Sequence, residues 1–159
     1  REPLTAKEYT LLYEKLNKEC RLLLNTIYYS GMRNSEVHKA TIETVNGVLV
    51  FNLNCCDRLK TKSSYRIIPI HSGIDSENIS KLNIRWNSIQ IHRTIKKLFP
   101  NRQLSLYSAR HSVITNLINS NVPPHIVSEL AGHSNKSMTL SNYFGGTELA
   151  VLSSYVELL

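Results

Sequence analysis

Glycine, proline and cysteine are all scarce in this 159-residue sequence, which contains 6, 5 and 3 of them. So few chain-breaking residues beside 42% hydrophobic residues exclude a disordered or collagen-like chain. The cysteines are an odd number, and Cys55 and Cys56 are adjacent, too close to pair with each other without strain. No CxxC or Cys/His spacing indicates a zinc site, so we expect reduced thiols in a reducing compartment.

Long apolar runs are missing as well. No stretch approaches the roughly 18 apolar residues of a membrane span, and nothing resembles a signal peptide. Internal repeats and low-complexity segments are also absent from the sequence. We therefore expect a soluble protein of the cytoplasm.

Acidic residues are outnumbered by basic ones. The 12 Asp and Glu stand against 19 Lys and Arg, which gives a net charge of +7. A chain of this length fits one domain with a sizeable core, because about 150 residues bury roughly 68–70% of their unfolded surface. The excess of positive charge favours a polyanionic partner, nucleic acid before membrane.

Helix signals dominate both ends of the chain. Thr5 and Glu8 have the spacing of a capping box, which predicts a helix through about Leu16. The apolar run 22–28 predicts a second, mostly buried helix that stops at Gly31.

The middle of the chain changes to strand patterns. Asn46-Gly47 is a type I′ hairpin signal between β-rich flanks, and residues 65–70 indicate a third strand after a turn over residues 60–64. Beyond Asn83 the helical pattern returns. The expected fold is mainly α with a small three-stranded antiparallel sheet.

Three segments carry candidate site residues, beginning with Arg110. An apolar stripe from Val113 to Ile118 predicts a helix that starts near Ser108, so Arg110 and His111 are expected in its first turn. Free N–H groups and the positive helix end make such a turn an anion site, and a guanidinium group there can bind phosphate bidentately. The alternative is a solvated surface arginine.

His133 follows a second predicted helix, which starts near Pro124 and stops at Gly132. It is therefore held at a helix end, and a short helix that ends near Tyr143 is expected to follow. Helix, tight turn and helix also describe a helix-turn-helix DNA reader, which is the competing interpretation.

Arg33 is the third candidate, in the link after Gly31. Asn34 or Ser35 is expected to cap the next helix, and Glu36 is close enough to orient the Arg33 guanidinium group. The alternative is a surface ion pair of little energetic value.

Together these segments resemble the successive motifs of the tyrosine recombinases, the phage integrase family. Four motifs follow one another in the family's order and with similar spacing: Gly31–Glu36 (GMRNSE), Tyr107–Ser112 (YSARHS), Leu130–Ser134 (LAGHS) and Tyr143–Gly146 (YFGG). The turn Leu59–Arg66 (LKTKSSYR) also resembles the sheet turn that delivers the family's catalytic lysine. The resemblance runs from about Leu4 to Gly146 and is closest to integrases of phages and genomic islands, which are mobile elements.

This resemblance implies the fold of the tyrosine recombinase catalytic domain, that of the DNA breaking-rejoining enzymes. It implies site-specific cleavage and rejoining of DNA with no metal and no other cofactor. Tyr143 would attack a backbone phosphorus to give a 3′-phosphotyrosyl link and a free 5′-hydroxyl. Arg33 and Arg110 would bind the non-bridging oxygens of the phosphate. Lys60 would protonate the leaving oxygen, and His133 would hydrogen-bond the phosphate or assist proton transfer.

The site departs from the family pattern at Tyr107, where the family usually has histidine. A phenol can donate a hydrogen bond to a phosphate oxygen, but it cannot serve as a base near neutral pH. Lys60 and Lys62 lie in the same turn, and the family's pattern favours Lys60.

The partner implied is double-stranded DNA, with a tetramer on two duplexes during synapsis and a monomer for the isolated domain. In this family a separate N-terminal domain closes the clamp around DNA, so residues 1–159 are expected to be a single catalytic domain without that core-binding domain. The terminal helix, residues 148–158, would dock on its own core or on a neighbouring protomer. A non-catalytic DNA-binding module, either a decayed integrase or a helix-turn-helix reader, is the main alternative. A type IB topoisomerase is a weaker third.

Overall fold

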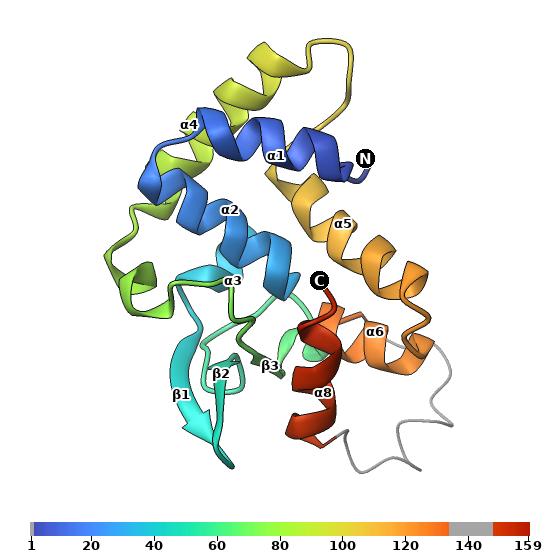
Figure 1. Cartoon of the computed structure of the whole chain (residues 1–159). Helices are drawn as coiled ribbons and strands as arrows, with labels where there is room; N and C mark the ends of the chain where they lie inside the picture. The colour runs from blue at the N-terminus through green and yellow to red at the C-terminus, as the bar shows by residue number, and fades with distance from the viewer. Residues whose placement is uncertain (1, 134–147) are drawn as a thin grey trace.

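The structure is a computed structural model that describes residues 2–133 and 148–159. Its elements confirm the expected mainly helical architecture around one small sheet (Figure 1). In chain order they are α1 (Ala6–Lys15), α2 (Lys18–Ser30), α3 (Asn34–Val37), β1 (Thr41–Val45), β2 (Val48–Asn52), η1 (Lys62–Ser64), β3 (Ile67–Pro69), η2 (Ser76–Lys81), α4 (Ile84–Leu98), α5 (Leu106–Asn119), α6 (Pro124–Ala131) and α8 (Leu149–Val156).

The start of α1 and the end of α2 lie where the local sequence predicts. The Thr5 hydroxyl accepts from the Glu8 backbone N–H at 3.2 Å, and the Glu8 carboxylate accepts from the Thr5 N–H at 2.9 Å. This is the predicted capping box at the start of α1. Helix α2 ends at Gly31, whose left-handed backbone (φ 65°) suits glycine.

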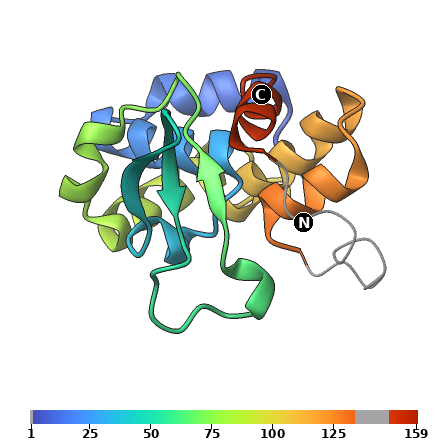
Figure 2. The same ribbon diagram turned by 90° about the horizontal axis from the view of Figure 1, so that it is seen from below.

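The sheet is antiparallel in the order β1-β2-β3. Asn46 and Gly47 connect β1 to β2 with φ values of 49° and 79°, as the type I′ turn requires. The hairpin and the third strand are thus confirmed, although β3 is shorter than expected. Figure 2 shows the connection from β2 to β3 running away from the sheet, with η1 on the side of α6.

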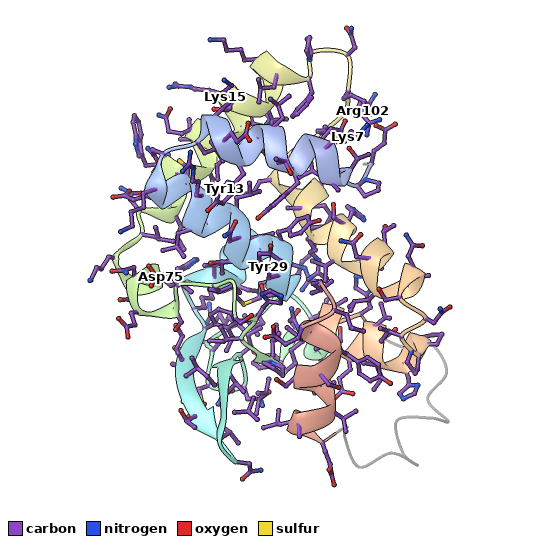
Figure 3. The ribbon with its side chains drawn as sticks, viewed as in Figure 1. Lys7, Tyr13, Lys15, Tyr29, Asp75 and Arg102 are labelled. Carbon is purple, nitrogen blue, oxygen red and sulfur yellow. The ribbon has the colours of Figure 1, made fainter. Side chains whose placement is uncertain are left out.

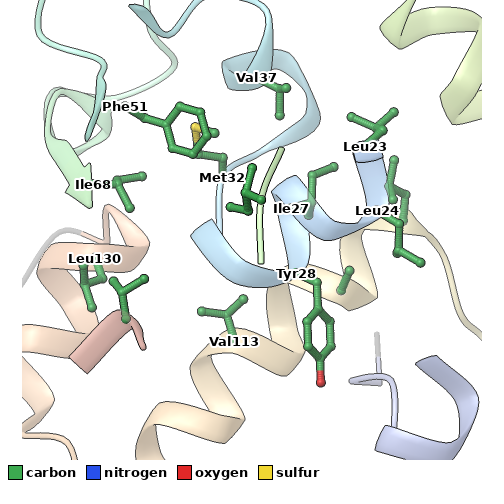
Figure 4. Packing of buried hydrophobic residues seen from close by; sticks show 14 of the residues in the cluster. Leu23, Leu24, Ile27, Tyr28, Met32, Val37, Phe51, Ile68, Val113 and Leu130 are labelled. Atoms are coloured by element: carbon green, nitrogen blue, oxygen red, sulfur yellow. The ribbon is translucent and has the colours of Figure 1, made fainter. Parts of the chain in front are cut away.

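The core lies where α2 packs against α4 and α5 on one side and meets the sheet on the other. Figure 4 shows side chains of α2, β2, β3 and α6 converging in one cluster. Met32, Phe51 and Ile68 are each 0% exposed within it. This packing buries Met32, which lies in the link between α2 and α3.

The terminal helix α8 docks on its own domain. Leu152 and Val156 are buried, and the helix packs against β3 and β2 (Figure 1). At its end the Glu157 carboxylate accepts from the Ser72 N–H at 2.8 Å and the Ser72 hydroxyl at 2.7 Å. His71 stacks on Tyr29 of α2 with ring centroids 4.1 Å apart. Figure 3 shows Tyr29 at the carboxyl end of α2.

Helix α5 begins two residues before the position that the apolar stripe suggests. Ser105 has extended backbone (φ −154°, ψ 174°), and its N–H donates to the Ser108 hydroxyl at 3.1 Å, so the helix starts at Leu106. Arg110 and His111 therefore lie in the second turn, and the expectation of an arginine among the free N–H groups of the first turn is wrong. Likewise Arg33, not Asn34 or Ser35, occupies the cap of α3.

Candidate active site

Three sequence motifs meet at one end of the helical layer. Arg33 lies in the link between α2 and α3, Arg110 on α5, and His133 directly after α6. Arg110 donates hydrogen bonds to the carbonyls of Gly31 and Ala131, which lie two residues before Arg33 and His133, and the charges of Arg33 and Arg110 both act on the His133 imidazole. The structure thus brings together these three of the predicted site residues.

Glu36 and Ser64 together form a clamp that holds the Arg33 side chain. Its Nη1 donates to Glu36 Oε1 at 2.6 Å and to the Ser64 hydroxyl at 3.0 Å. Its backbone N–H donates to the other Glu36 oxygen at 2.8 Å. Because Glu36 is only 2% exposed, this pair is not the solvated surface pair of the alternative interpretation.

Arg110 is almost completely buried, at 1% exposed, and joins two helix ends. Its Nη1 donates to the carbonyl of Gly31, and its Nη2 donates to the carbonyl of Ala131 at 2.5 Å. Its Nε–H is buried and has no acceptor among the described residues. The solvated-surface alternative for Arg110 is therefore wrong.

A third arginine, Arg66, stands between these groups and was not among the predicted site residues. It donates through Nη2 to Glu36 at 3.1 Å, through Nε to the Leu130 carbonyl at 2.9 Å, and through Nη1 to the Ser64 carbonyl at 2.9 Å. A sequence signal existed. Strand alternation places Arg66 on the same face as buried Ile68, where a charge requires partners.

Gly132 closes the site on the side of α6. Its φ of 63° ends the helix as predicted, but close packing also requires the missing side chain. A Cβ there would lie 2.6 Å from Arg66 Nη1 and 2.9 Å from the Ser63 carbonyl. The Ser63 hydroxyl donates to the Gly132 carbonyl at 3.2 Å, so the turn that carries the lysines is fastened to the end of α6.

The charges of this cluster do not balance. Among the described residues Glu36 forms ion pairs with Arg33 and Arg66, and Arg110 lies near enough for the charges of all three to act on it. Burial, together with the charges of Arg33 and Arg66, lowers the pKa of Arg110 to about 10. Burial also lowers the pKa of Arg66, against the attraction of Glu36. Burial alone would raise the pKa of Glu36, but the charge and hydrogen bonds of its arginines hold it below the usual range.

His133 is exposed at the rim of this cluster. Partial desolvation lowers the pKa of its imidazole, and the charges of Arg110, Arg33 and Arg66 lower it further. The neutral ring is therefore favoured at neutral pH, and it can donate or accept a hydrogen bond.

The other predicted residues have less definite places. Lys60 and Lys62 are both exposed in the turn before β3, and within residues 2–133 and 148–159 neither ammonium group forms a hydrogen bond or an ion pair. Tyr107, in the first turn of α5, packs edge-on against His111 with centroids 4.9 Å apart. The predicted nucleophile, Tyr143, lies outside the described residues, as does the helix expected before it.

Neither a metal-binding cluster nor a membrane-spanning helix occurs in the described part of the chain. Across these residues no group of three or more His, Cys, Asp or Glu side chains could hold a metal ion. The helices found in the same residues are all too short or too polar to cross a membrane.

Comparisons with known proteins bear on the family and the fold of the chain. Residues 77–148, which include Arg110, His133 and Tyr143, match the Phage integrase family. The fold is similar to that of the XerH site-specific recombinase bound to its difH substrate in a pre-cleavage complex (TM-score 0.59, 19% identity). It is also similar to the Tn1549 transposon integrase in complex with transposon right end DNA (TM-score 0.52, 16% identity). No curated protein matches the sequence.

The two solved proteins are longer than this chain. The chain is covered over 97% and 99% of its length but spans only 53% and 65% of the two solved chains. The fold is that of the tyrosine recombinase catalytic domains, and the match to the Phage integrase family supports the predicted assignment of the chain to the tyrosine recombinases.

Proposed function

We propose that the chain is the catalytic domain of a site-specific DNA recombinase that cleaves and rejoins strands through a 3′-phosphotyrosyl intermediate. The observation that carries the proposal is the buried excess of positive charge formed by Arg33, Arg66 and Arg110 around Glu36. A phosphodiester supplies the negative charge that this cluster lacks, and the negative charge of a pentacoordinate transition state is greater still.

The proposed roles follow from donor groups that remain available. A guanidinium group has five N–H donors, and the protein carbonyls use two of those of Arg110. Among the described residues the Arg110 Nε–H has no acceptor, and Arg33 uses its Nη1 group on Glu36 and Ser64, so the Arg110 Nε–H and the Arg33 Nη2 group are the donors proposed to bind the non-bridging oxygens. His133 adds a neutral ring for a hydrogen bond or a proton transfer.

In the proposed reaction the Tyr143 hydroxyl passes its proton to His133, and the Tyr143 oxygen forms a bond to phosphorus as the bond from phosphorus to the 5′-oxygen breaks. Lys60 donates a proton to that leaving oxygen, and the reverse step restores the diester with no net loss of bond energy. Neither a nucleotide cofactor nor a metal ion is needed for this exchange. Tyr107 would donate a hydrogen bond to the phosphate in place of the family's usual histidine. We also propose a monomer for the domain alone and a tetramer on two duplexes.

A suicide-substrate assay tests this function. The chain is incubated with nicked duplexes that tile the DNA on both sides of its gene, and covalent protein–DNA adducts are separated by denaturing electrophoresis. Tyr143→Phe should abolish the adduct while DNA binding persists. Tyr155→Phe on α8, the matched control, should leave the adduct unchanged.

The alternatives give different results in the same assay. Salt-sensitive DNA binding with no adduct from any duplex would indicate a non-catalytic module. An adduct that survives Tyr143→Phe would remove Tyr143 as the nucleophile. Relaxation of supercoiled DNA without a specific site would favour a topoisomerase.

A further inference from the structure

Arg66 contacts three of the segments that carry proposed catalytic groups. Through Glu36 it reaches the clamp on Arg33, through the Ser64 carbonyl it holds the turn that carries the lysines, and through the Leu130 carbonyl it holds the end of α6. It is 6% exposed, and the protein itself accepts bonds from each of its three guanidinium nitrogens. We propose that Arg66 is a positioning residue that sets the geometry of Arg33, the lysine turn and His133 without touching DNA; this inference rests on the proposed function.

The chemistry of arginine fits this task in a way that lysine does not. The planar guanidinium group presents its donors in a fixed fork, so one side chain fixes the directions to a carboxylate and to two carbonyls at once. A lysine at the same place would keep the charge but would lose these fixed directions. Charge alone is therefore not what the site uses.

The carboxylate of Glu36 connects Arg66 to Arg33. Each of its oxygens accepts from Arg33, at 2.6 Å to Nη1 and 2.8 Å to the backbone N–H, and Oε2 also accepts from Arg66 at 3.1 Å. A displacement of Arg66 is thus passed directly to the group that orients Arg33. An isolated ion pair between Arg33 and Glu36 would lack this connection to the rest of the site.

Gly132 gives a second way to disturb the same contact while every charged group is kept. An alanine Cβ would lie 2.6 Å from Arg66 Nη1 and 2.8 Å from its Cζ, so the guanidinium group would have to move. The effects of Gly132→Ala and Arg66→Met should then be less than additive, because both act through one contact.

The test compares single-turnover cleavage of a nicked duplex with equilibrium binding of the same duplex. Arg66→Met should lower the cleavage rate by about 100-fold, as expected when reacting groups are misplaced by about 1 Å. The dissociation constant for DNA should stay within about threefold, because the residue makes no phosphate contact. The cleavage rate of Arg66→Lys should remain well below that of the unmodified chain. Gly132→Ala should show the same loss of cleavage rate as Arg66→Met.

Arg21 provides a matched control. It too binds backbone carbonyls, those of Tyr13 at 2.8 Å and Glu14 at 3.0 Å, but at the junction of α1 and α2. Arg21→Met should leave the cleavage rate unchanged. Hydrogen exchange should become faster at residues 33–36, 61–64 and 130–133 in Arg66→Met and not in Arg21→Met.

Three results of these measurements would overturn the inference about Arg66. A weaker affinity for DNA with an unchanged cleavage rate would make Arg66 a binding residue. Full activity of Arg66→Lys would show that charge alone matters, and an unchanged rate in Arg66→Met would remove the role altogether. An unmodified chain that forms no adduct would overturn the proposed function. This outcome is separate, because adduct formation by the unmodified chain is measured before any variant is tested.

Discussion

The burial of Arg110 leads to a prediction about the stability of the chain. Arg110→Met removes two charge-assisted hydrogen bonds to carbonyls, and such bonds are worth about 1.5–3 kcal/mol each. The substitution also removes a charge that the folded state disfavours. The pKa of Arg110 falls well below its ordinary value, to about 10, which corresponds to about 3 kcal/mol at neutral pH.

The two contributions largely cancel. We therefore expect Arg110→Met to lower the free energy of unfolding by only about 0–3 kcal/mol, although the side chain is 1% exposed. Leu117→Ala on the same helix, also 1% exposed, should cost about 2–5 kcal/mol, because it leaves a cavity and no charge penalty is relieved. The methionine variant should nevertheless lose DNA cleavage.

Urea unfolding of the three chains at neutral pH measures these differences, and equal m-values would show that the unfolded states are comparable. A loss of stability in Arg110→Met greater than in Leu117→Ala would refute the reasoning. It would mean that the two carbonyl bonds outweigh the cost of placing a cation among cations.

Two further predictions concern the rim of the site and the turns. Because desolvation and nearby guanidinium groups lower the pKa of His133, the unfolded chain binds more protons between that lowered pKa and the ordinary 6.5, so stability should rise with pH through this window. His133→Asn should flatten the rise in urea unfolding, and an NMR titration giving a pKa above 6.5 in the free chain would contradict it. Gly31→Ala and Gly47→Ala should each cost about 1–2 kcal/mol for positive φ. Gly31→Ala should cost more, because its Cβ would lie 3.3 Å from Val113 whereas nothing lies within 4 Å at Gly47; equal losses of Tm would argue against this contact.

Features determined by neighbouring residues could be predicted from the sequence. The capping box of Thr5 and Glu8, the Asn46-Gly47 turn and the stops at Gly31 and Gly132 depend on backbone preferences within a few residues, and each lies where it was expected. The predicted start of α5 is wrong by two residues, because the apolar stripe does not mark the first turn. The apolar stripe marks the buried face of a helix, whereas the first turn is set by the polar contact between Ser105 and Ser108.

The partners of the buried charges could not be predicted in the same way. Arg66 is separated by 30 residues from Glu36 and by 64 from Leu130, and nothing local indicates that these groups meet. The sequence does show a charged residue on the strand face of Ile68, which requires burial with partners but does not identify them. The same holds for Arg110, whose carbonyl partners lie on two other helices.

Helix ends explain how the fold tolerates so much buried positive charge. Gly31 and Gly132 both adopt the left-handed conformation that ends α2 and α6, and Arg110 binds a carbonyl at each of these two ends. The carboxyl end of a helix carries a partial negative charge, so two helices direct their negative ends at one guanidinium group. The glycines thus contribute to the site electrostatically as well as by shape. A helix end is only a partial charge, however, and the cluster keeps the net positive charge that a bound phosphate would neutralise.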